Sequence, residues 1–437
     1  MSTLLRLATA GSVDDGKSTL VGRLLHDSKS VLSDQLAAVE RASKDKGLGI
    51  VDLALLTDGL RAEREQGITI DVAYRYFATG KRTFILADCP GHVQYTRNTV
   101  TGSSTADALV LLLDVRKGVL EQTRRHLAVA VLLRVPYIIF AVNKIDLVDY
   151  SEADFRAVAD QIEQVAAELK APHVSSVPVS ALVGDNIVTR SPNTPWYDGP
   201  SLLELLEDLP SVGDPADRPF RFPVQLPIRP QQAARGVSAD YRGYAGQIAS
   251  GVVRVGDRVV VLPSGRQTSV VGIDTADGEL DEAFAPQSVT LRLADEIDIT
   301  RGELIAAAQD APTPTQDVDA MVAWLHERPL RVGQKVLLKH TTRSVQGIVR
   351  DIHGRLALDT MTPEETATLA LNDIGRVKLR LAAPINAEDY SSSRRTGSFI
   401  LVDPQSGASL AAGMIRGDQA FGEQARIDAD EALNWSI

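Results

Sequence analysis

The sequence is nearly free of cysteine, with Cys89 as the single one among 437 residues. One cysteine excludes an intrachain disulfide and a metal-binding cysteine cluster, and it is typical of proteins in a reducing compartment. Uncharged apolar runs long enough to cross a bilayer are also missing, and Arg6 interrupts the mildly apolar start. We therefore expect a cytoplasmic protein that does not associate with membranes.

The sequence also has fewer basic than acidic residues, with 46 lysine and arginine residues against 57 acidic ones and a formal net charge of -11. This balance opposes non-specific attraction to a phosphate backbone, so we expect no nucleic-acid partner. Hydrophobic residues (44%) and charged residues (24%) are at the level of ordinary globular proteins. A chain of this length is too long for one core and suits two to four domains.

The first half of the sequence alternates short apolar runs with helical patterns, which predicts an α/β domain with a mostly parallel sheet. The predicted strands are apolar throughout, as buried parallel strands are, and cover residues 4–8, 83–88, 108–114, 137–143 and 174–179. Helices are predicted to begin at Ser18, near His92, at Glu121 and at Ser151. Ser151 offers an N-cap, with Asp154 in the matching position of a capping box.

The second half of the sequence changes character after a polar, proline-rich link at residues 211–219. Short Val/Ile/Leu segments broken by turns follow, and a second proline-rich break at 310–315 divides them into two sets. Such segments predict β-barrels. We therefore predict an α/β domain over residues 1–212, two β-barrel domains over 213–312 and 313–416, and a tail over 417–437.

A glycine-rich segment follows the first predicted strand and opens the first predicted helix, as a phosphate-binding P-loop does. Its residues are Gly11, Ser12, Val13, Asp14, Asp15, Gly16, Lys17, Ser18 and Thr19. Backbone N–H groups of this turn face the phosphates, the Lys17 ammonium contacts the β- and γ-phosphates, and the Ser18 hydroxyl binds Mg²⁺. The P-loop alone predicts a nucleoside triphosphate and does not identify the base.

A second motif ends the predicted strand at 83–88 and comprises Asp88, Cys89, Pro90, Gly91 and His92. An aspartate in this place can hold Mg²⁺ through water, and a glycine N–H can meet the γ-phosphate. We expect Cys89 to be a small structural residue.

A third motif, at residues 143–146, comes at the end of the predicted strand at 137–143 and predicts the base. Guanine presents two donors, N1–H and the N2 amine, that the Asp146 carboxylate can accept together, whereas adenine does not. Asn143 can address the base edge, and the stem of Lys144 can cover its face. A backbone N–H for the guanine oxygen is predicted from the loop of Ser180, Ala181 and Leu182.

A threonine at the end of a long polar loop completes the set. Thr69 can bind Mg²⁺ only while a γ-phosphate orders the loop, which makes it a switch residue. Five elements in this order predict a GTP hydrolase that uses Mg²⁺ as cofactor and GTP as substrate.

The stretches GITI, DCPGH and NKID, in this order, resemble translational GTPases such as elongation factor Tu. The resemblance implies a P-loop GTPase domain followed by two β-barrels. It also implies that His92 orients the attacking water, flanked by the apolar pair Val13 and Ile68. The catalytic residues are then His92, Lys17 and Gly91.

Longer stretches resemble the large subunit of bacterial sulfate adenylyltransferase, namely GSVDDGKSTLVGRLLHDSK, DGLRAEREQGITIDVAYRYF and GHVQYTRNTVTGSS. Translation factors usually carry GHVDHGKT in the P-loop, and Asp15 replaces the second histidine of that pattern. This resemblance implies that GTP hydrolysis accompanies the work of a separate small subunit of the ATP-pyrophosphatase type. That partner joins sulfate to AMP and releases pyrophosphate, so we expect a heteromer.

Two other interpretations remain. The chain can be an elongation factor-type GTPase that delivers aminoacyl-tRNA, or a GTP-regulated scaffold without coupled chemistry. Some relatives carry a fused adenylylsulfate kinase, but the sequence holds no second GxxxxGK[ST] motif, so kinase activity is not predicted.

Overall fold

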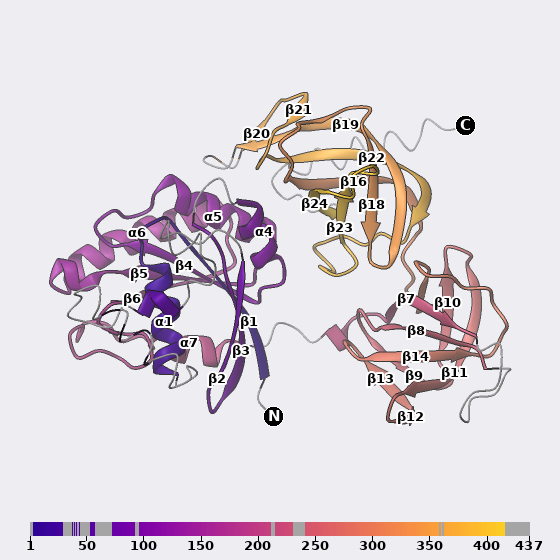
Figure 1. Ribbon diagram of the computed structural model, residues 1–437, viewed down its shortest axis with the longest axis horizontal. Coiled ribbons are helices and arrows are strands. Elements are labelled where there is room, and N and C mark those ends of the chain that lie inside the picture. Colours follow the sequence, from indigo (N-terminus) through magenta and orange to yellow (C-terminus); the bar gives the residue numbers. More distant parts are fainter. Residues whose placement is uncertain are drawn as a thin grey trace. The chain divides into compact units, whose positions relative to one another are not determined.

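The computed structural model describes residues 3–28, 37, 39, 41, 43, 53–56, 72–91, 96–210, 215–229, 241–357, 360 and 362–415 (Figure 1). Contacts between Cα atoms divide the chain into two compact units. One comprises Met1–Val212 with Ala357–Met361, and the other comprises Gly213–Leu356 with Thr362–Ile437. Within the described residues no helix is both long and apolar enough to span a membrane.

The first unit is built on a six-stranded sheet with the order β2-β3-β1-β4-β5-β6. All neighbouring strands are parallel except β2, which runs antiparallel to β3 at one edge. The strands are β1 (Thr3–Gly11), β2 (Ala73–Ala78), β3 (Arg82–Asp88), β4 (Ala108–Asp114), β5 (Tyr137–Asn143) and β6 (His173–Pro178). The five predicted strands are therefore present, and β2 was not predicted.

Helices cover this sheet, and four of them begin close to the predicted positions, whereas α7 was not predicted. They are α1 (Lys17–Asp27), α4 (Thr96–Ser104), α5 (Glu121–Leu132), α6 (Glu152–Glu168) and α7 (Leu202–Asp208), with short 3₁₀ turns η1 (Leu53–Leu56), η3 (Ile145–Val148) and η4 (Pro215–Asp217). Ser151 caps α6 by accepting the N–H of Asp154 at 3.3 Å. The reciprocal capping box belongs to α7, where Ser201 and Glu204 each accept the other's backbone N–H.

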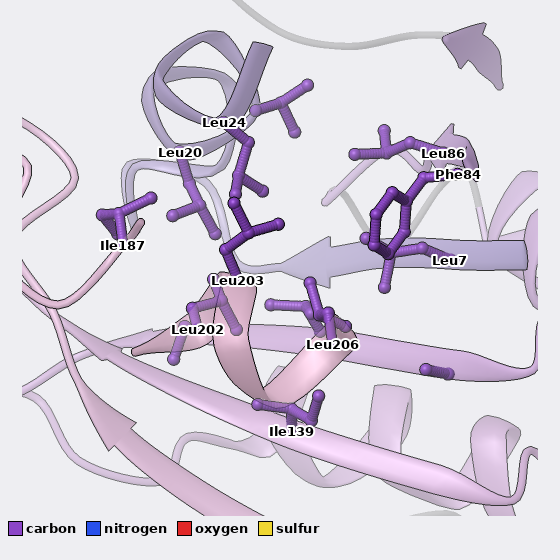
Figure 2. Packing of buried hydrophobic residues seen from close by; sticks show 14 of the residues in the cluster. Leu7, Leu20, Leu24, Phe84, Leu86, Ile139, Ile187, Leu202, Leu203 and Leu206 are labelled. Carbon is purple, nitrogen blue, oxygen red and sulfur yellow. The ribbon is translucent and has the colours of Figure 1, made fainter. Parts of the chain in front are cut away.

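The core of this unit lies where α1 and α7 pack on the sheet. Figure 2 shows Leu20 and Leu24 of α1 and Leu206 of α7 in one buried cluster with Phe84 of β3 and Ile139 of β5. These side chains are at most 1% exposed, and burying each one fully is worth about 1.5–3 kcal/mol. The packing holds α1, and with it the P-loop, in a fixed position against β1 and β3.

Arg82 ties the start of β3 to the end of α7. Its side chain is buried, and Nη1 donates to the carbonyl oxygens of Leu206 at 3.0 Å and Leu209 at 2.8 Å. The last carbonyls of a helix have no partner within the helix, so a cation there satisfies them and complements the helix dipole. β3 therefore begins at this buried anchor and ends at Asp88.

The second unit holds two antiparallel barrels, each with its own core. The first is closed by the ring β10-β15-β7-β8-β14-β11, because β10 also pairs with β11. Its strands are β7 (Arg221–Ile228), β8 (Gly243–Gln247), β9 (Val252–Arg254), β10 (Arg258–Leu262), β11 (Arg266–Thr275), β12 (Gly278–Leu280), β13 (Glu282–Phe284), β14 (Ser288–Leu293) and β15 (Leu304–Ala307).

The second barrel is closed by the ring β18-β23-β24-β16-β22-β19. Its strands are β16 (Thr315–Trp324), β17 (Leu330–Arg331), β18 (Lys335–His340), β19 (Arg343–Ala357), β20 (Thr362–Glu364), β21 (Thr368–Leu369), β22 (Ile374–Ile385), β23 (Ser398–Val402) and β24 (Ser409–Ile415). The predicted fold class, an α/β domain followed by two β-barrels, is confirmed. The boundaries at residues 212, 312 and 416 stay predictions.

Candidate functional site

The P-loop connects β1, which ends at Gly11, to α1, which begins at Lys17. Gly16 has a left-handed conformation (φ 94°), and a Cβ atom there would collide with Nδ2 of Asn143. Gly16 is also the N-cap of α1 and offers no side-chain acceptor to the first turn. The first N–H groups of this helix therefore suit an anion such as a phosphate.

Lys17 and Asp88 meet where β1 and β3 end side by side. Lys17 Nζ lies 2.6 Å from Oδ1 of Asp88, and the Thr9 hydroxyl donates to the same oxygen at 2.9 Å. The two charged side chains are 7% and 4% exposed, and buried charges need partners of this kind. The structure thus brings together the predicted phosphate-binding ammonium and the predicted magnesium carboxylate.

Gly91 lies against the P-loop. A Cβ atom on Gly91 would collide with the backbone oxygen of Gly11, so no other residue fits without a shift. Next to it, the Cys89 N–H donates to the Thr9 carbonyl at 3.1 Å, and burial raises the pKa of the Cys89 thiol to about 12. The thiol therefore stays protonated at neutral pH and does not act as a nucleophile.

Two residues of α5 contact the Gly91 peptide and were not predicted. Gln122 Nε2 donates to the Gly91 carbonyl at 3.4 Å and lies 3.1 Å from Nε2 of His126. His126 is 3% exposed, and burial lowers its pKa to about 4. At neutral pH the imidazole is uncharged, so one of its nitrogens can accept the amide hydrogen of Gln122. Gln122 and His126 therefore give the Gly91 peptide, which is predicted to meet the γ-phosphate, a polar contact that carries no charge.

Asn143 connects the P-loop to the loop after β6. Its side chain is 2% exposed, Nδ2 donates to the Asp15 carbonyl at 2.7 Å, and Oδ1 accepts the Ala181 N–H at 2.9 Å. Both bonds are buried and would leave unsatisfied backbone groups if the amide were lost. Asn143 therefore sets the spacing between the predicted phosphate and base sites.

Lys144 extends along the same side of the P-loop. Its Nζ donates to the Asp14 carbonyl at 2.5 Å and lies 3.1 Å from Oδ2 of Asp114. Asp114, at the end of β4, also accepts two hydrogen bonds from the Arg116 guanidinium at 3.0 and 2.6 Å. Burial would raise the pKa of Asp114, but these hydrogen bonds outweigh it and hold the pKa well below its usual range. Asp114 and Arg116 were not predicted, although the position of Asp114 at the end of a buried strand is a signal.

Asp15 is a buried carboxyl group inside the P-loop. Its Oδ2 accepts the Ser12 N–H at 3.0 Å, while Oδ1 has no hydrogen bond among the described residues and lies 4.0 Å from Nζ of Lys117. Only 1% of Asp15 is exposed, and burial raises its pKa to about 6. The position that distinguishes this P-loop from those of translation factors thus holds a carboxyl group that is costly to ionise.

Some of the remaining predicted site residues lie in the part of the chain that the structure describes, and others lie outside it. Asp146 lies in η3, directly after Asn143 and Lys144, and is half-buried. Val13 is 41% exposed. His92, Thr69 and Ile68 lie outside the described residues, so their roles stay predictions.

Comparison with known proteins assigns the chain to a family. Residues 2–211 match the model of the Elongation factor Tu GTP binding domain, and residues 317–416 match the GTP-eEF1A C-terminal domain-like model. Sulfate adenylyltransferase subunit 1 from Laribacter hongkongensis (strain HLHK9) is 49% identical over 436 residues, which are 99% of this chain and 89% of that protein. The chain belongs to this family.

A second sulfate adenylyltransferase subunit 1 and a bifunctional enzyme show similar identities. The subunit from Cellvibrio japonicus (strain Ueda107) is 48% identical over 99% of this chain and 89% of its own length. The bifunctional enzyme CysN/CysC from Mycobacterium tuberculosis (strain ATCC 25618 / H37Rv) is 53% identical over 96% of this chain and 68% of its own length. The predicted resemblance and the GTPase class are therefore confirmed, and the elongation-factor alternative is not favoured.

A solved structure, that of sup35 complexed with GDP, covers 95% of this chain at 22% identity with a TM-score of 0.42. This similarity is too low to support a functional argument.

Proposed function

We propose that this chain binds and hydrolyses GTP, and that hydrolysis drives formation of adenylylsulfate and pyrophosphate from ATP and sulfate by a partner small subunit of the ATP-pyrophosphatase type. Family membership supports the reaction. The nucleotide site rests on one observation, that three motifs meet at one edge of the sheet. Lys17 contacts Asp88, Gly91 lies next to Gly11, and Asn143 donates a hydrogen bond to the P-loop.

The phosphate side of the site rests on Lys17 and the start of α1. The Lys17 ammonium neutralises charge on the β- and γ-phosphates, and its contact with Asp88 holds it at the ends of β1 and β3. Gly91 presents its N–H to the γ-phosphate at a place where its backbone already touches the P-loop. The position of Lys17 at the first turn of a buried helix fixes the direction in which the charge is presented.

Magnesium fits the donors in this site. The Ser18 hydroxyl, Asp88 through water and Thr69 would hold Mg²⁺, a hard cation that prefers oxygen ligands and keeps several waters. The described residues contain no group of three or more His, Cys, Asp or Glu that could hold a metal ion by itself. Two hydroxyl groups and one carboxylate leave the rest of the coordination of Mg²⁺ to water and phosphate oxygens. When bound, Mg²⁺ supplies charge neutralisation for phosphoryl transfer.

The base side of the site rests on Asp146 and on the frame made by Asn143. The Asp146 carboxylate accepts the N1–H and N2 amine of guanine, and the stem of Lys144 covers the base. Asn143 holds the P-loop and the 180–182 loop at a fixed spacing.

Hydrolysis can drive sulfate activation only through a conformational difference. A ligand shifts an equilibrium solely by its differential affinity for two states, so the partner must distinguish the GTP state from the GDP state. Thr69 and Gly91 sense the γ-phosphate, and His92 ends that state by orienting the attacking water, with Val13 and Ile68 as its apolar flank.

The test uses the chain purified together with its small subunit, in a buffer that contains no inorganic pyrophosphatase. ATP and sulfate are supplied under three conditions: with GTP, with GDP, or with no guanine nucleotide. We expect adenylylsulfate to exceed the level reached with ATP alone only when GTP is present. Lys17→Ala and Ser18→Ala should abolish this gain, because they remove the phosphate charge and the magnesium ligand. RNA retained through purification, together with equal adenylylsulfate under all three conditions, would support the elongation-factor alternative instead.

A further inference from the structure

Arg23 is a charged residue of α1 that the predicted nucleotide motifs do not include. Its guanidinium reaches the loop after β6, where Nε donates to the Ala181 carbonyl at 3.3 Å and Nη2 donates to the Leu182 carbonyl. The partners are 158 and 159 residues away in the sequence. A cation on the P-loop helix therefore holds the loop to which we assign guanine recognition.

The anchor for these hydrogen bonds is rigid. Arg23 lies in the second turn of α1, between core residues Leu20 and Leu24, which are 0% exposed and point into the core (Figure 2). Its side chain is 19% exposed, and its stem passes Gly184, where a Cβ atom would lie 3.7 Å from Cδ of Arg23. Gly184 has a left-handed conformation (φ 104°), which turns the chain at this point.

Ser180 and Ala181 begin this loop with buried side chains, but the residues after them have little side-chain packing to orient them. Leu182 is 50% exposed and Val183 is 55% exposed, so hydrogen bonds to the backbone decide the direction of these peptides. On one side Asn143 Oδ1 accepts the Ala181 N–H, and on the other the Ser180 hydroxyl accepts the Val183 N–H at 3.3 Å. Arg23 supplies the donors for the two carbonyls that lie between these contacts.

Peptide geometry converts these contacts into a direction for one N–H group. The Ala181 carbonyl and the Leu182 N–H belong to one planar trans peptide and point in opposite directions. Because Arg23 fixes the carbonyl, it also fixes the N–H of Leu182. Charge-assisted hydrogen bonds of this kind are about twice as strong as neutral ones, so the peptide is firmly held.

We propose that Arg23 is a positioning residue for guanine recognition: it holds the Ala181 and Leu182 carbonyls so that the Leu182 N–H is directed at the guanine O6 atom. The inference rests on the proposed base site at Asn143, Asp146 and residues 180–182. It makes α1 a common support for phosphate binding, through Lys17, and for base selection.

A purely structural role for Arg23 is the competing explanation. The guanidinium also lies 3.8 Å from the Asp27 carboxylate, an i,i+4 pair, and surface pairs of this kind contribute little. Structural loss would weaken every nucleotide equally, whereas loss of O6 positioning weakens only nucleotides that carry O6. Nucleotide analogues therefore separate the two roles.

The test measures the affinities of GDP, inosine diphosphate and the diphosphate of 2-aminopurine riboside, which lacks O6, by competition with a fluorescent GDP. In Arg23→Met we expect about tenfold weaker binding of GDP and inosine diphosphate, the effect of one misplaced hydrogen bond, and less than twofold change for the 2-aminopurine analogue. The hydrolysis rate at saturating GTP should stay within twofold, because the phosphate contacts remain. Arg23→Lys should restore part of the affinity.

Arg156→Met is the matched control, because Arg156 also pairs with an acid four residues away, Glu152, on the exposed face of α6. It should bind all three nucleotides like the parent. If Arg23→Met weakens the binding of all three nucleotides equally, or of none of them, the positioning role is wrong. If Arg23→Met does not fold, the same comparison is made with Arg23→Lys. Asp146→Asn distinguishes failure of this inference from failure of the proposed base site. If Asp146→Asn changes the preference to xanthine nucleotide but Arg23→Met has no base-dependent effect, only the role of Arg23 is wrong. If Asp146→Asn does not change the preference, the base site itself is wrong.

Discussion

The buried carboxyl group of Asp15 makes the stability of the GTPase unit depend on pH in a way that one substitution isolates. In the folded chain the pKa of Asp15 rises from 3.8 to about 6, mainly because burial disfavours the charged form. The folded state then holds the proton more tightly than the unfolded state, so ionisation costs stability as the pH rises through this window. The shift in pKa corresponds to a loss of about 3 kcal/mol in the free energy of unfolding, and this loss is complete above about pH 7.

Asp15→Asn removes this cost and keeps the contact, because the amide oxygen can still accept the Ser12 N–H that Oδ2 accepts at 3.0 Å. We expect the variant and the parent to be nearly equal in stability at about pH 4. Their difference should grow in favour of the variant up to about pH 7 and stay level above, by up to about 3 kcal/mol. Lys117, at 4.0 Å from Oδ1, reduces the cost in the parent.

Amide hydrogen exchange of peptides from β1 and α1 is the assay, because it reports opening of the GTPase unit separately from the barrels. Variant and parent are compared at each pH, so the intrinsic pH dependence of exchange cancels. Asp160→Asn, on the exposed face of α6, is the control and should show no pH-dependent difference. A difference that does not vary with pH, or one that favours the parent as pH rises, would refute the reasoning.

Three further substitutions test the site and its support. Asp146→Asn should weaken GTP at least tenfold and favour xanthine nucleotide, measured by calorimetry, and unchanged GTP affinity would contradict the base assignment. Gly16→Ala should lower nucleotide affinity at least tenfold in a fluorescent GDP titration, because the methyl group displaces the Asn143 amide at a left-handed position; parental affinity would contradict this. Arg82→Met should lower the free energy of unfolding by about 2–4 kcal/mol in hydrogen exchange of β3, since one buried and one partly buried carbonyl lose a charged donor; a loss near zero would show that the anchor is dispensable.

Local patterns in the sequence predicted most of the first domain. The P-loop and the buried strands could be predicted because each depends on a single residue or a short run of residues. Gly16 adopts a conformation that favours glycine, and β4 is a short apolar run that is fully buried. The edge strand β2 was missed because its alternation of exposed Tyr74 and Tyr76 with less exposed neighbours is short and follows the polar switch segment.

Contacts between distant segments were beyond prediction from motifs. Arg23 and Arg82 read as solvated charges in a helix and at a strand start, yet each satisfies carbonyls more than a hundred residues away. His126 likewise reads as one helical residue among many, and only the close approach of α5 to Gly91 shows why it is buried and neutral. Tertiary packing, which spacing in one sequence does not reveal, decides these roles.

The coupling of GTP hydrolysis to sulfate activation is tested most directly by measuring GDP and pyrophosphate release together in the complex with the small subunit. With ATP, GTP and sulfate, the parent should release both in step, and sulfate omission should slow both. His92→Ala should still bind GTP and the partner but hydrolyse GTP at a small fraction of the parental rate, because it lacks the group that orients water. We predict that its adenylylsulfate then stops at the low level that ATP alone permits. Adenylylsulfate rising past that level in His92→Ala, without matching GDP release, would contradict the account and favour the scaffold interpretation.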